Sequence, residues 1–237
     1  MDRTIKPSER GRAGDNLLLS LMPPEVAARL AGRLEPVVLP AGAVLATVGQ
    51  EVRSVYFPLD TVLSLLHTDV NGSTVQVALL GREGMVGLGC VLSDRHLATC
   101  VVLTSGTAMR LGGRLLRELF ESESAVREVL LSYGGRLLTQ AWQTVVCNRH
   151  HSPESQLCML LLLVLDRAPQ AELALTHETI ARLFGLRRET ISQAAMRVQE
   201  RGYVRYSRGH IKVLDRAGLQ SHACACYERL RPMLPLR

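Results

Sequence analysis

The stretch "LTHETIARLFGLRRETISQAAMRVQERGYVRY", residues 175–206, decides the fold. Thr176 is a good N-cap for a short helix. Gly185 then supplies a turn, because glycine adopts a positive φ at little cost. A second helix follows within three residues. The apolar residues at helical spacing are Ile180, Leu183 and Phe184 in the first helix and Ile191, Ala194, Ala195 and Val198 in the second. This pattern predicts a helix-turn-helix, whose helices cross at roughly 90–120°.

The outward N-terminal side of the second helix is polar and basic. It comprises Arg187, Arg188, Glu189, Thr190, Ser192 and Gln193. In a DNA major groove, arginine can bind guanine O6 and N7, glutamate can accept from cytosine N4, and glutamine can pair with adenine. Helix N-terminal amides and hydroxyls suit phosphates. An ordinary solvated first turn, with an ion pair worth little, explains the same residues equally well. The motif alone leaves both interpretations open.

The residues that follow favour DNA. The run "GYVRYSRGHIKVLDRAGL", residues 202–219, predicts a strand, a tight turn and a second strand, which together form a wing. Its basic side chains, placed to reach backbone phosphates, are Arg205, Arg208, His210 and Lys212. The net charge is +6, and residues 150–237 hold 13 basic and 8 acidic side chains against 15 and 14 in residues 1–149. A polyanion partner for the last third of the chain fits this excess, and so does a basic surface kept for solubility.

Upstream, short β-branched or alternating runs fill the chain between Val37 and Leu111. Their spacing predicts a small antiparallel β-barrel or β-sandwich. Asn71-Gly72 predicts a type I′ hairpin. The segment "GREGMVGLGCVLSDRHL", residues 81–97, breaks the strand pattern and predicts a loop with a short helix.

A long helix is predicted from about Gly113 to Arg149. Two adjacent apolar stripes run along its second half, formed by Leu130, Leu137 and Ala141 and by Leu131, Leu138, Trp142 and Val145. So wide an apolar face favours a symmetric dimer through this helix, with an intramolecular lid as the alternative. Ser152 then suits an N-cap and Pro153 a first helical position, which places a domain boundary near residue 150.

The combination of barrel, long helix and winged helix carrying "R-E-T-I-S" closely resembles the Crp/Fnr family of bacterial transcription regulators. The resemblance covers about residues 17–230 and implies an α+β fold. The expected organisation is a flexible tail (1–16), a cyclic-nucleotide-binding-like β-barrel sensor (17–112), a dimerisation helix (113–149) and a winged helix-turn-helix (150–237). It assigns base reading to Arg188, Glu189 and Gln193. Phosphate contacts would fall to Thr176, Arg187 and Thr190, joined by Ser192, Arg208, His210 and Lys212.

Members of this family that bind cyclic nucleotides carry a cassette in which a glutamate holds the ribose and an arginine neutralises the phosphate. The matching stretches here are "GMVGL" (84–88) and "LATC" (97–100), with Met85 and Ala98 at those two positions. Neither side chain can do the work, because a buried phosphate needs a paired cation. We therefore expect no cyclic AMP binding. If the alignment with the cassette were shifted, Glu83 and Arg95 would supply the missing glutamate and arginine. Any other effector would meet a pocket formed by Glu83, Gly84, Met85, Ala98 and Thr99.

Six cysteines raise a thiol- or metal-sensing alternative. Cys147, His150, His151 and Cys158 flank the predicted domain junction, and "HACAC" lies at residues 222–226. His and Cys suit zinc or iron, but the pairs lack the Cys-x₂-Cys repetition of a dependable site. We predict no metal and no cofactor, with packing cysteines as the default. A thiol–imidazole enzyme using Cys147 and a protein-only interaction module are weaker alternatives.

The remaining expectations concern partners and compartment. The N-terminal "MDRTIKPSERGRAGDN" lacks the apolar core of a signal peptide, and no apolar run reaches the roughly 20 residues of a spanning helix. We expect a cytoplasmic, non-enzymatic homodimer that binds a palindromic double-stranded DNA operator. RNA polymerase is an expected partner and a membrane is not.

Overall fold

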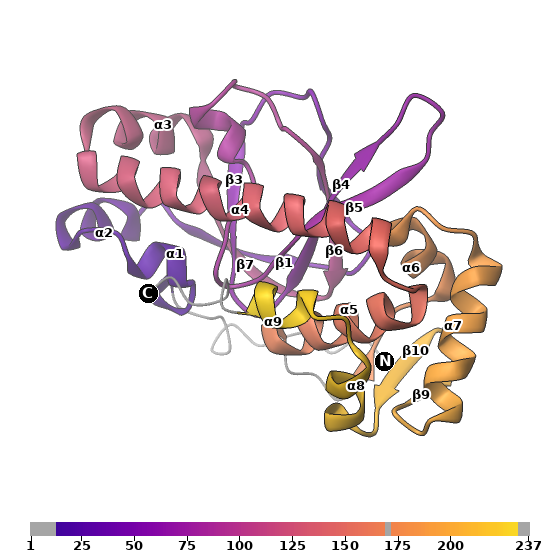
Figure 1. Cartoon of the computed structure of the whole chain (residues 1–237). Coiled ribbons are helices and arrows are strands. Elements are labelled where there is room, and N and C mark those ends of the chain that lie inside the picture. The colour runs from indigo at the N-terminus through magenta and orange to yellow at the C-terminus, as the bar shows by residue number, and fades with distance from the viewer. Residues whose placement is uncertain (1–12, 169–171, 232–237) are drawn as a thin grey trace. The chain divides into compact units, whose positions relative to one another are not determined.

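The computed structural model describes residues 13–168 and 172–231. The chain forms two compact units (Figure 1). The first unit comprises the chain up to Leu63 together with Leu80–Gly134, and the second comprises Ser64–Leu79 together with the chain from Gly135 to Pro235. No helix in the described ranges is long and apolar enough to cross a lipid bilayer.

The first unit begins with short helices, a 3-10 turn (Ala13–Asp15), α1 (Leu17–Ser20) and α2 (Pro24–Ala31). Most of the predicted flexible tail lies outside the described residues, but its last residue, Asn16, is buried. The Asn16 amide donates to the main-chain oxygens of Pro58 (2.8 Å) and Gly84 (3.0 Å), and its carbonyl accepts from Leu19 N–H. The tail prediction is therefore wrong at this residue, because an amide with three satisfied hydrogen bonds fixes the backbone there.

Two open antiparallel sheets replace the predicted closed barrel. The strands are β1 (Glu35–Leu39), β2 (Val44–Ala46), β3 (Ser54–Pro58), β4 (Val62–Thr68), β5 (Thr74–Leu80), β6 (Thr99–Thr104) and β7 (Gly106–Gly112). They pair in the orders β1-β7-β3 and β2-β6-β4-β5. Within the described residues, strand pairing ends at β1 and β3 in one sheet and at β2 and β5 in the other, so neither sheet closes.

The loop between β4 and β5 is a hairpin, as predicted, but of another type. Gly72 has φ +84°, whereas Asn71 is not among the residues with positive φ. A type I′ turn needs positive φ at both central residues, so the prediction of that turn type is wrong. The reason is Asp69, whose carboxylate accepts from Asn71 N–H (2.9 Å) and Ser73 N–H (2.8 Å) and closes a longer loop.

The segment after β5 forms a loop with one short 3-10 helix, Leu88–Val91, which confirms the prediction for residues 81–97. The chain then leaves β7 as two helices rather than one, α3 (Gly113–Ser122) and α4 (Ser124–His150). The break lies at Glu123, which is extended (φ −114°, ψ 108°) and whose carboxylate pairs with Arg29 on α2 at 2.7 Å. An extended residue cannot continue a helix, so the single long helix prediction is wrong at this point.

Helix α4 presents one exposed apolar stripe. Its members are Leu131, Leu138, Trp142, Val145 and Val146. The first four are separated by seven, four and three residues and therefore lie on one face, and Trp142 and Val145 are 64% and 68% exposed. Leu130, on the neighbouring stripe, is buried instead. Leu137 and Ala141, the other members of that stripe, are half-buried, so the stripe that begins at Leu130 is the less exposed of the two.

The second unit holds the helix-turn-helix. Its elements after α4 are α5 (Pro153–Arg167), β8 (Glu172–Leu173), α6 (His177–Phe184), α7 (Arg188–Glu200), β9 (Val204–Ser207), β10 (His210–Val213), α8 (Arg216–His222) and α9 (Cys226–Leu230). Helix α5 packs against α7, α8 and α9, and Leu157, Leu161, Ile191 and Val198 are fully buried. The strands form a sheet in the order β8-β10-β9. Ser152 caps α5 and Pro153 is its first residue, as predicted.

Candidate DNA-binding interface

Helix α6 is held by the two caps that the sequence suggests. The Thr176 hydroxyl accepts from Thr179 N–H at 3.0 Å, which satisfies a free amide at the start of α6. Gly185 ends α6 with φ +64°, a left-handed conformation that favours glycine. The four residues predicted to face inward from α7, namely Ile191, Ala194, Ala195 and Val198, are all buried. The helix-turn-helix prediction is confirmed in these local features.

The start of α7 is open to solvent. Arg187 is the N-cap residue and Arg188 the first helical residue, and both are exposed together with Glu189 and Gln193. Thr190 and Ser192 are half-buried. The Ser192 hydroxyl lies 3.0 Å from His177 Nδ1, a hydrogen bond that joins α7 to α6. Ser192, which was assigned to phosphate contact, thus also makes a hydrogen bond within the protein. The three residues assigned to base reading have exposed side chains.

The wing is a two-residue hairpin. Strands β9 and β10 pair with His210 opposite Ser207 and Lys212 opposite Arg205, which leaves Arg208 and Gly209 at the tip. Both tip residues have positive φ, +47° and +83°, as a type I′ turn requires. Asn, Asp or Gly normally occupies the first of these positions, because a longer side chain is strained there. An arginine in this place suggests that its side chain has a role.

A groove of about 640 Å³ connects the starts of both helices with the wing. Its lining residues are Leu175, Thr176, His177, Glu178, Arg188, Tyr206, Ser207, Arg208 and Gly209. Three residues predicted to contact DNA, Thr176, Arg188 and Arg208, therefore share one surface. Figure 1 shows α6, α7 and the β9–β10 hairpin gathered in the same part of the second unit.

Two residues that sequence reasoning missed form the base of this groove. The rings of His177 and Tyr206 meet edge to face, with centroids 4.8 Å apart. Burial, followed by the nearby positive charge of Arg188, lowers the pKa of His177 below its usual 6.5 and favours the neutral ring. Burial also raises the pKa of Tyr206. No sequence signal singles out this pair, since one residue begins a helix and the other lies in a strand.

Comparisons with known proteins identify both domains. Residues 36–123 match the model of the cyclic nucleotide-binding domain, and residues 155–222 match that of the Crp-like helix-turn-helix domain. A Crp/Fnr-family structure from Eubacterium rectale superposes with a TM-score of 0.69 at 17% identity, over 86% of this chain and 96% of that one. The chain has the domains and the fold of a Crp/Fnr-type transcription regulator.

Other solved structures give the same result. FixK2 from Bradyrhizobium japonicum has a TM-score of 0.67 at 15% identity, over 81% of this chain and 98% of its own. TTHB099, a CRP-family transcriptional regulator from Thermus thermophilus, has a TM-score of 0.66 at 14% identity, over 80% and 96%. At such identities the likeness concerns the fold. No curated protein sequence matches the chain.

The stretch that matches the cassette, around Met85, is occupied by the protein's own contacts. Met85 is 1% exposed, and its main-chain N–H donates to the Tyr133 hydroxyl (3.0 Å), which donates in turn to the Met85 carbonyl (2.7 Å). A Cβ at Gly84 would lie 2.8 Å from the same hydroxyl. Glu83 is buried, and its carboxylate accepts from Gly81 N–H at 3.2 Å. Tyr133 thus occupies the space beside two of the predicted effector residues, Gly84 and Met85.

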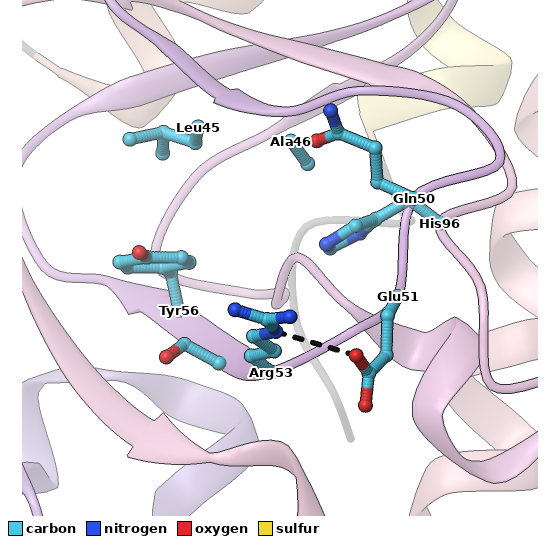
Figure 2. Close-up of a pocket in the computed structure, with 8 residues that line it drawn as sticks. Leu45, Ala46, Gln50, Glu51, Arg53, Tyr56 and His96 are labelled. Carbon is cyan, nitrogen blue, oxygen red and sulfur yellow. Dashed lines mark hydrogen bonds and ion pairs between the residues drawn. The ribbon is translucent and has the colours of Figure 1, made fainter.

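The other two effector residues, Ala98 and Thr99, are half-buried, and the Thr99 hydroxyl accepts from Val48 N–H at 3.3 Å. A cavity of about 470 Å³ opens in the first unit, lined by Leu45, Ala46, Gln50, Glu51, Arg53, Ser54, Tyr56 and His96. Figure 2 shows Arg53 in this cavity paired with Glu51, at 3.3 Å. Burial lowers the pKa of His96, which favours its neutral form. The lining of this cavity, among the described residues, includes none of the five predicted effector residues.

Proposed function

We propose that this Crp/Fnr-type regulator is a homodimer that reads a palindromic DNA operator and does not use cyclic AMP. The observation that carries the proposal is the groove that Thr176, Arg188 and Arg208 line together. It combines a helix N-terminus, two arginines and a wing tip on one open surface. These are the groups that bind phosphates and base edges in DNA complexes.

Base reading is proposed for Arg188, Glu189 and Gln193. All three are exposed on the first two turns of α7. In a recognition helix, it is the N-terminal residues that reach base edges. A bidentate arginine–guanine pair is worth about 1–3 kcal/mol of discrimination against a wrong base.

Backbone contacts are proposed for residues around this reading surface. Arg187 precedes α7, while Arg208, His210 and Lys212 lie on the wing. The side chains of all four residues are exposed. His210 and Lys212 alternate with buried Ile211 and so share one face of β10. Thr176, Thr190 and Ser192 complete the set. The two hydroxyls of Thr176 and Ser192 already make internal hydrogen bonds, so the arginines and Lys212 are expected to supply most of the electrostatic affinity.

Dimerisation is proposed through the exposed stripe of α4. A solvent-facing tryptophan, two leucines and two valines along one helix form a face that a second copy would cover symmetrically. The two recognition helices of such a dimer would enter major grooves about 34 Å apart. RNA polymerase is the protein partner that we propose for the DNA-bound dimer.

The proposal that cyclic AMP has no part rests on the buried Met85 and on the bonds that Tyr133 makes beside it. The proposal that the chain is not an enzyme rests on Cys147. Its thiol is 1% exposed and lies 3.5 Å from the Cys224 thiol rather than in an open cleft. A catalytic thiol needs access to substrate.

Selection of bound sequences from a random DNA library tests this function. The full chain, with and without cyclic AMP, should enrich two inverted half-sites whose centres are about 10–10.5 base pairs apart, or a multiple of this. Cyclic AMP should change neither the enriched sequence nor the affinity. Enrichment of nothing above background would refute DNA reading, and enrichment only with cyclic AMP would refute the effector proposal.

A further inference from the structure

Three cysteines and one histidine converge in the second unit. Cys147 lies in the last turn of α4, His151 directly follows that helix, and Cys224 and Cys226 lie where α8 passes into α9. One possible ligand atom from each residue falls in a group whose members are all within 4.8 Å of one another. Residues 147 and 224 are far apart in the chain, so only the fold brings the four together.

The distances within this Cys₃His cluster suit a single tetrahedral ion. The Sγ atoms of Cys147 and Cys224 are 3.5 Å apart, and Cys226 Sγ is 3.4 Å from His151 Nδ1. A zinc–sulfur bond of about 2.3 Å places two sulfurs of a tetrahedron about 3.8 Å apart. The cluster is thus close to the size of a filled site, and small side-chain shifts would suffice to complete it.

The surroundings are those of a closed site. All three cysteines are buried, and they pack together with the partly buried Met159. Four protein donors leave no coordination position for a substrate, which is typical of structural rather than catalytic zinc. Buried thiols next to a histidine can also serve only as packing residues in the core. Packing alone, however, does not require four donor atoms to converge on one point.

Neighbouring amides hold the cluster in place. The Gln143 amide donates to Cys226 Sγ at 3.0 Å. The Gln156 amide donates to the main-chain oxygen of His151 at 2.9 Å and lies 3.4 Å from that of Cys147. Hydrogen bonds of this kind orient metal ligands and are commonly as important as the ligands' own packing. A hydrogen bond with the Cys147 thiol lowers the pKa of Cys224, although burial opposes this shift.

We infer that Cys147, His151, Cys224 and Cys226 bind one Zn²⁺ ion in a closed tetrahedral site. Sulfur and imidazole nitrogen are the donors that zinc prefers, and the set has no carboxylate or carbonyl oxygen that would favour calcium or magnesium. The ion would fasten the connection between α8 and α9 to the C-terminal end of α4. None of the four residues lines the groove assigned to DNA contact.

Metal content of the purified full chain tests this inference. The protein is reduced, supplied with Zn²⁺, freed of unbound metal and measured by elemental analysis, and it should retain one zinc per chain. Replacement by Co²⁺ should give sulfur-to-cobalt charge-transfer bands and the intense visible bands of tetrahedral cobalt. Absence of retained zinc and of these bands in the folded, reduced parent would overturn the inference.

Variants locate the ion. Loss of a supporting hydrogen bond lowers metal affinity about 10–100-fold, so Gln143→Ala should lower zinc affinity by a factor in this range. His151→Ala and Cys226→Ser each remove a ligand and should lower zinc affinity by more than that. The matched controls are His150→Ala, which changes the exposed neighbouring histidine, and Cys158→Ala, which changes a buried cysteine outside the cluster. Both should bind zinc like the parent. Equal zinc affinity in His151→Ala and the parent would contradict the assignment.

Folding is controlled separately. His151→Cys keeps four donors and should retain one zinc, with a cobalt spectrum shifted toward an all-sulfur site. Zinc should raise the melting temperature of the parent and of His150→Ala, and raise it less in His151→Ala, because an ion that binds only the native state stabilises it. A melting temperature that zinc leaves unchanged in the parent would count against the site even if Cys226→Ser failed to fold.

Discussion

Arg188, the first residue of α7, and Arg208, at the tip of the β9–β10 wing, line the same groove. The edge-to-face contact between His177 and Tyr206 forms its base and joins the start of α6 to the wing strand. The groove also contains Glu178, whose carboxylate balances part of the positive charge. The two arginines are therefore positioned by packing from two different elements, and each can be changed without touching the other's support.

Arg208 is expected to serve DNA affinity rather than folding. Its positive φ is better suited to asparagine or glycine, so Arg208→Asn and Arg208→Gly should keep the turn and leave the free energy of unfolding within about 1 kcal/mol of the parent. Both should bind all DNA more weakly and reduce the slope of log K against log salt by about 0.9, as loss of one phosphate contact does. Urea unfolding and anisotropy titrations at several salt concentrations measure the two effects. Unchanged DNA affinity and salt slope would show that Arg208 is only a turn residue.

Arg188 should instead govern sequence preference. Arg188→Ala is expected to cost about 1–3 kcal/mol on the selected operator and much less on random DNA, because base contacts carry the discrimination. Arg182→Ala is a suitable control, since Arg182 is exposed on α6 and does not line the groove. Competition titrations with single-base operator variants should show relaxed preference at one position in each half-site. An equal loss on operator and random DNA would reassign Arg188 to phosphate.

The α4 stripe predicts the oligomeric state. Val145→Glu should weaken dimerisation by at least about tenfold, because burial of one valine is worth about 1.5–3 kcal/mol and a symmetric dimer contains the change twice. Val38→Glu is the matched control, with a valine on β1 that is 59% exposed against 68% for Val145. Sedimentation velocity over a concentration series measures the equilibrium. A dimer that Val145→Glu and Val38→Glu leave equally intact would place the interface elsewhere.

His177 should make stability depend on pH. Its folded pKa lies below the usual 6.5, so the unfolded chain binds the proton more readily. The stabilisation is complete above about 6.5, the unfolded value, and is lost as pH falls through the folded pKa. His177→Gln removes the titrating group, so its free energy of unfolding should fall less than that of the parent between neutral and mildly acid pH. Parallel pH profiles for the two proteins would exclude this role.

Local sequence signals predicted the elements of the reading surface well. Thr176 and Gly185 act through caps that depend on a few neighbouring residues, and the inward face of α7 follows from helical periodicity alone. The wing strands could be predicted equally well from the sequence, since Ile211 alternates with polar residues. Each of these features depends on residues within a single turn or strand. Residue spacing in the sequence was therefore enough to predict them.

Features that depend on distant partners could not be predicted in this way. The helix break at Glu123 coincides with an ion pair to Arg29, and the loop after β4 is closed by Asp69 rather than by the Asn-Gly pair alone. The groove requires the contact between His177 and Tyr206, and the Cys₃His cluster requires α4 and the α8–α9 connection to meet. Cysteine spacing along the chain could not show this cluster for the same reason, because its members come from separated parts of the sequence.

The most direct test of the account is the ratio of operator to scrambled-DNA affinity at physiological salt, measured by fluorescence anisotropy with the full chain. The operator is the half-site pair recovered by selection. The account predicts that the operator is bound at least about 10³-fold more tightly, as sequence-specific regulators require. Equal dissociation constants for the two DNAs, in a folded and dimeric protein, would contradict it.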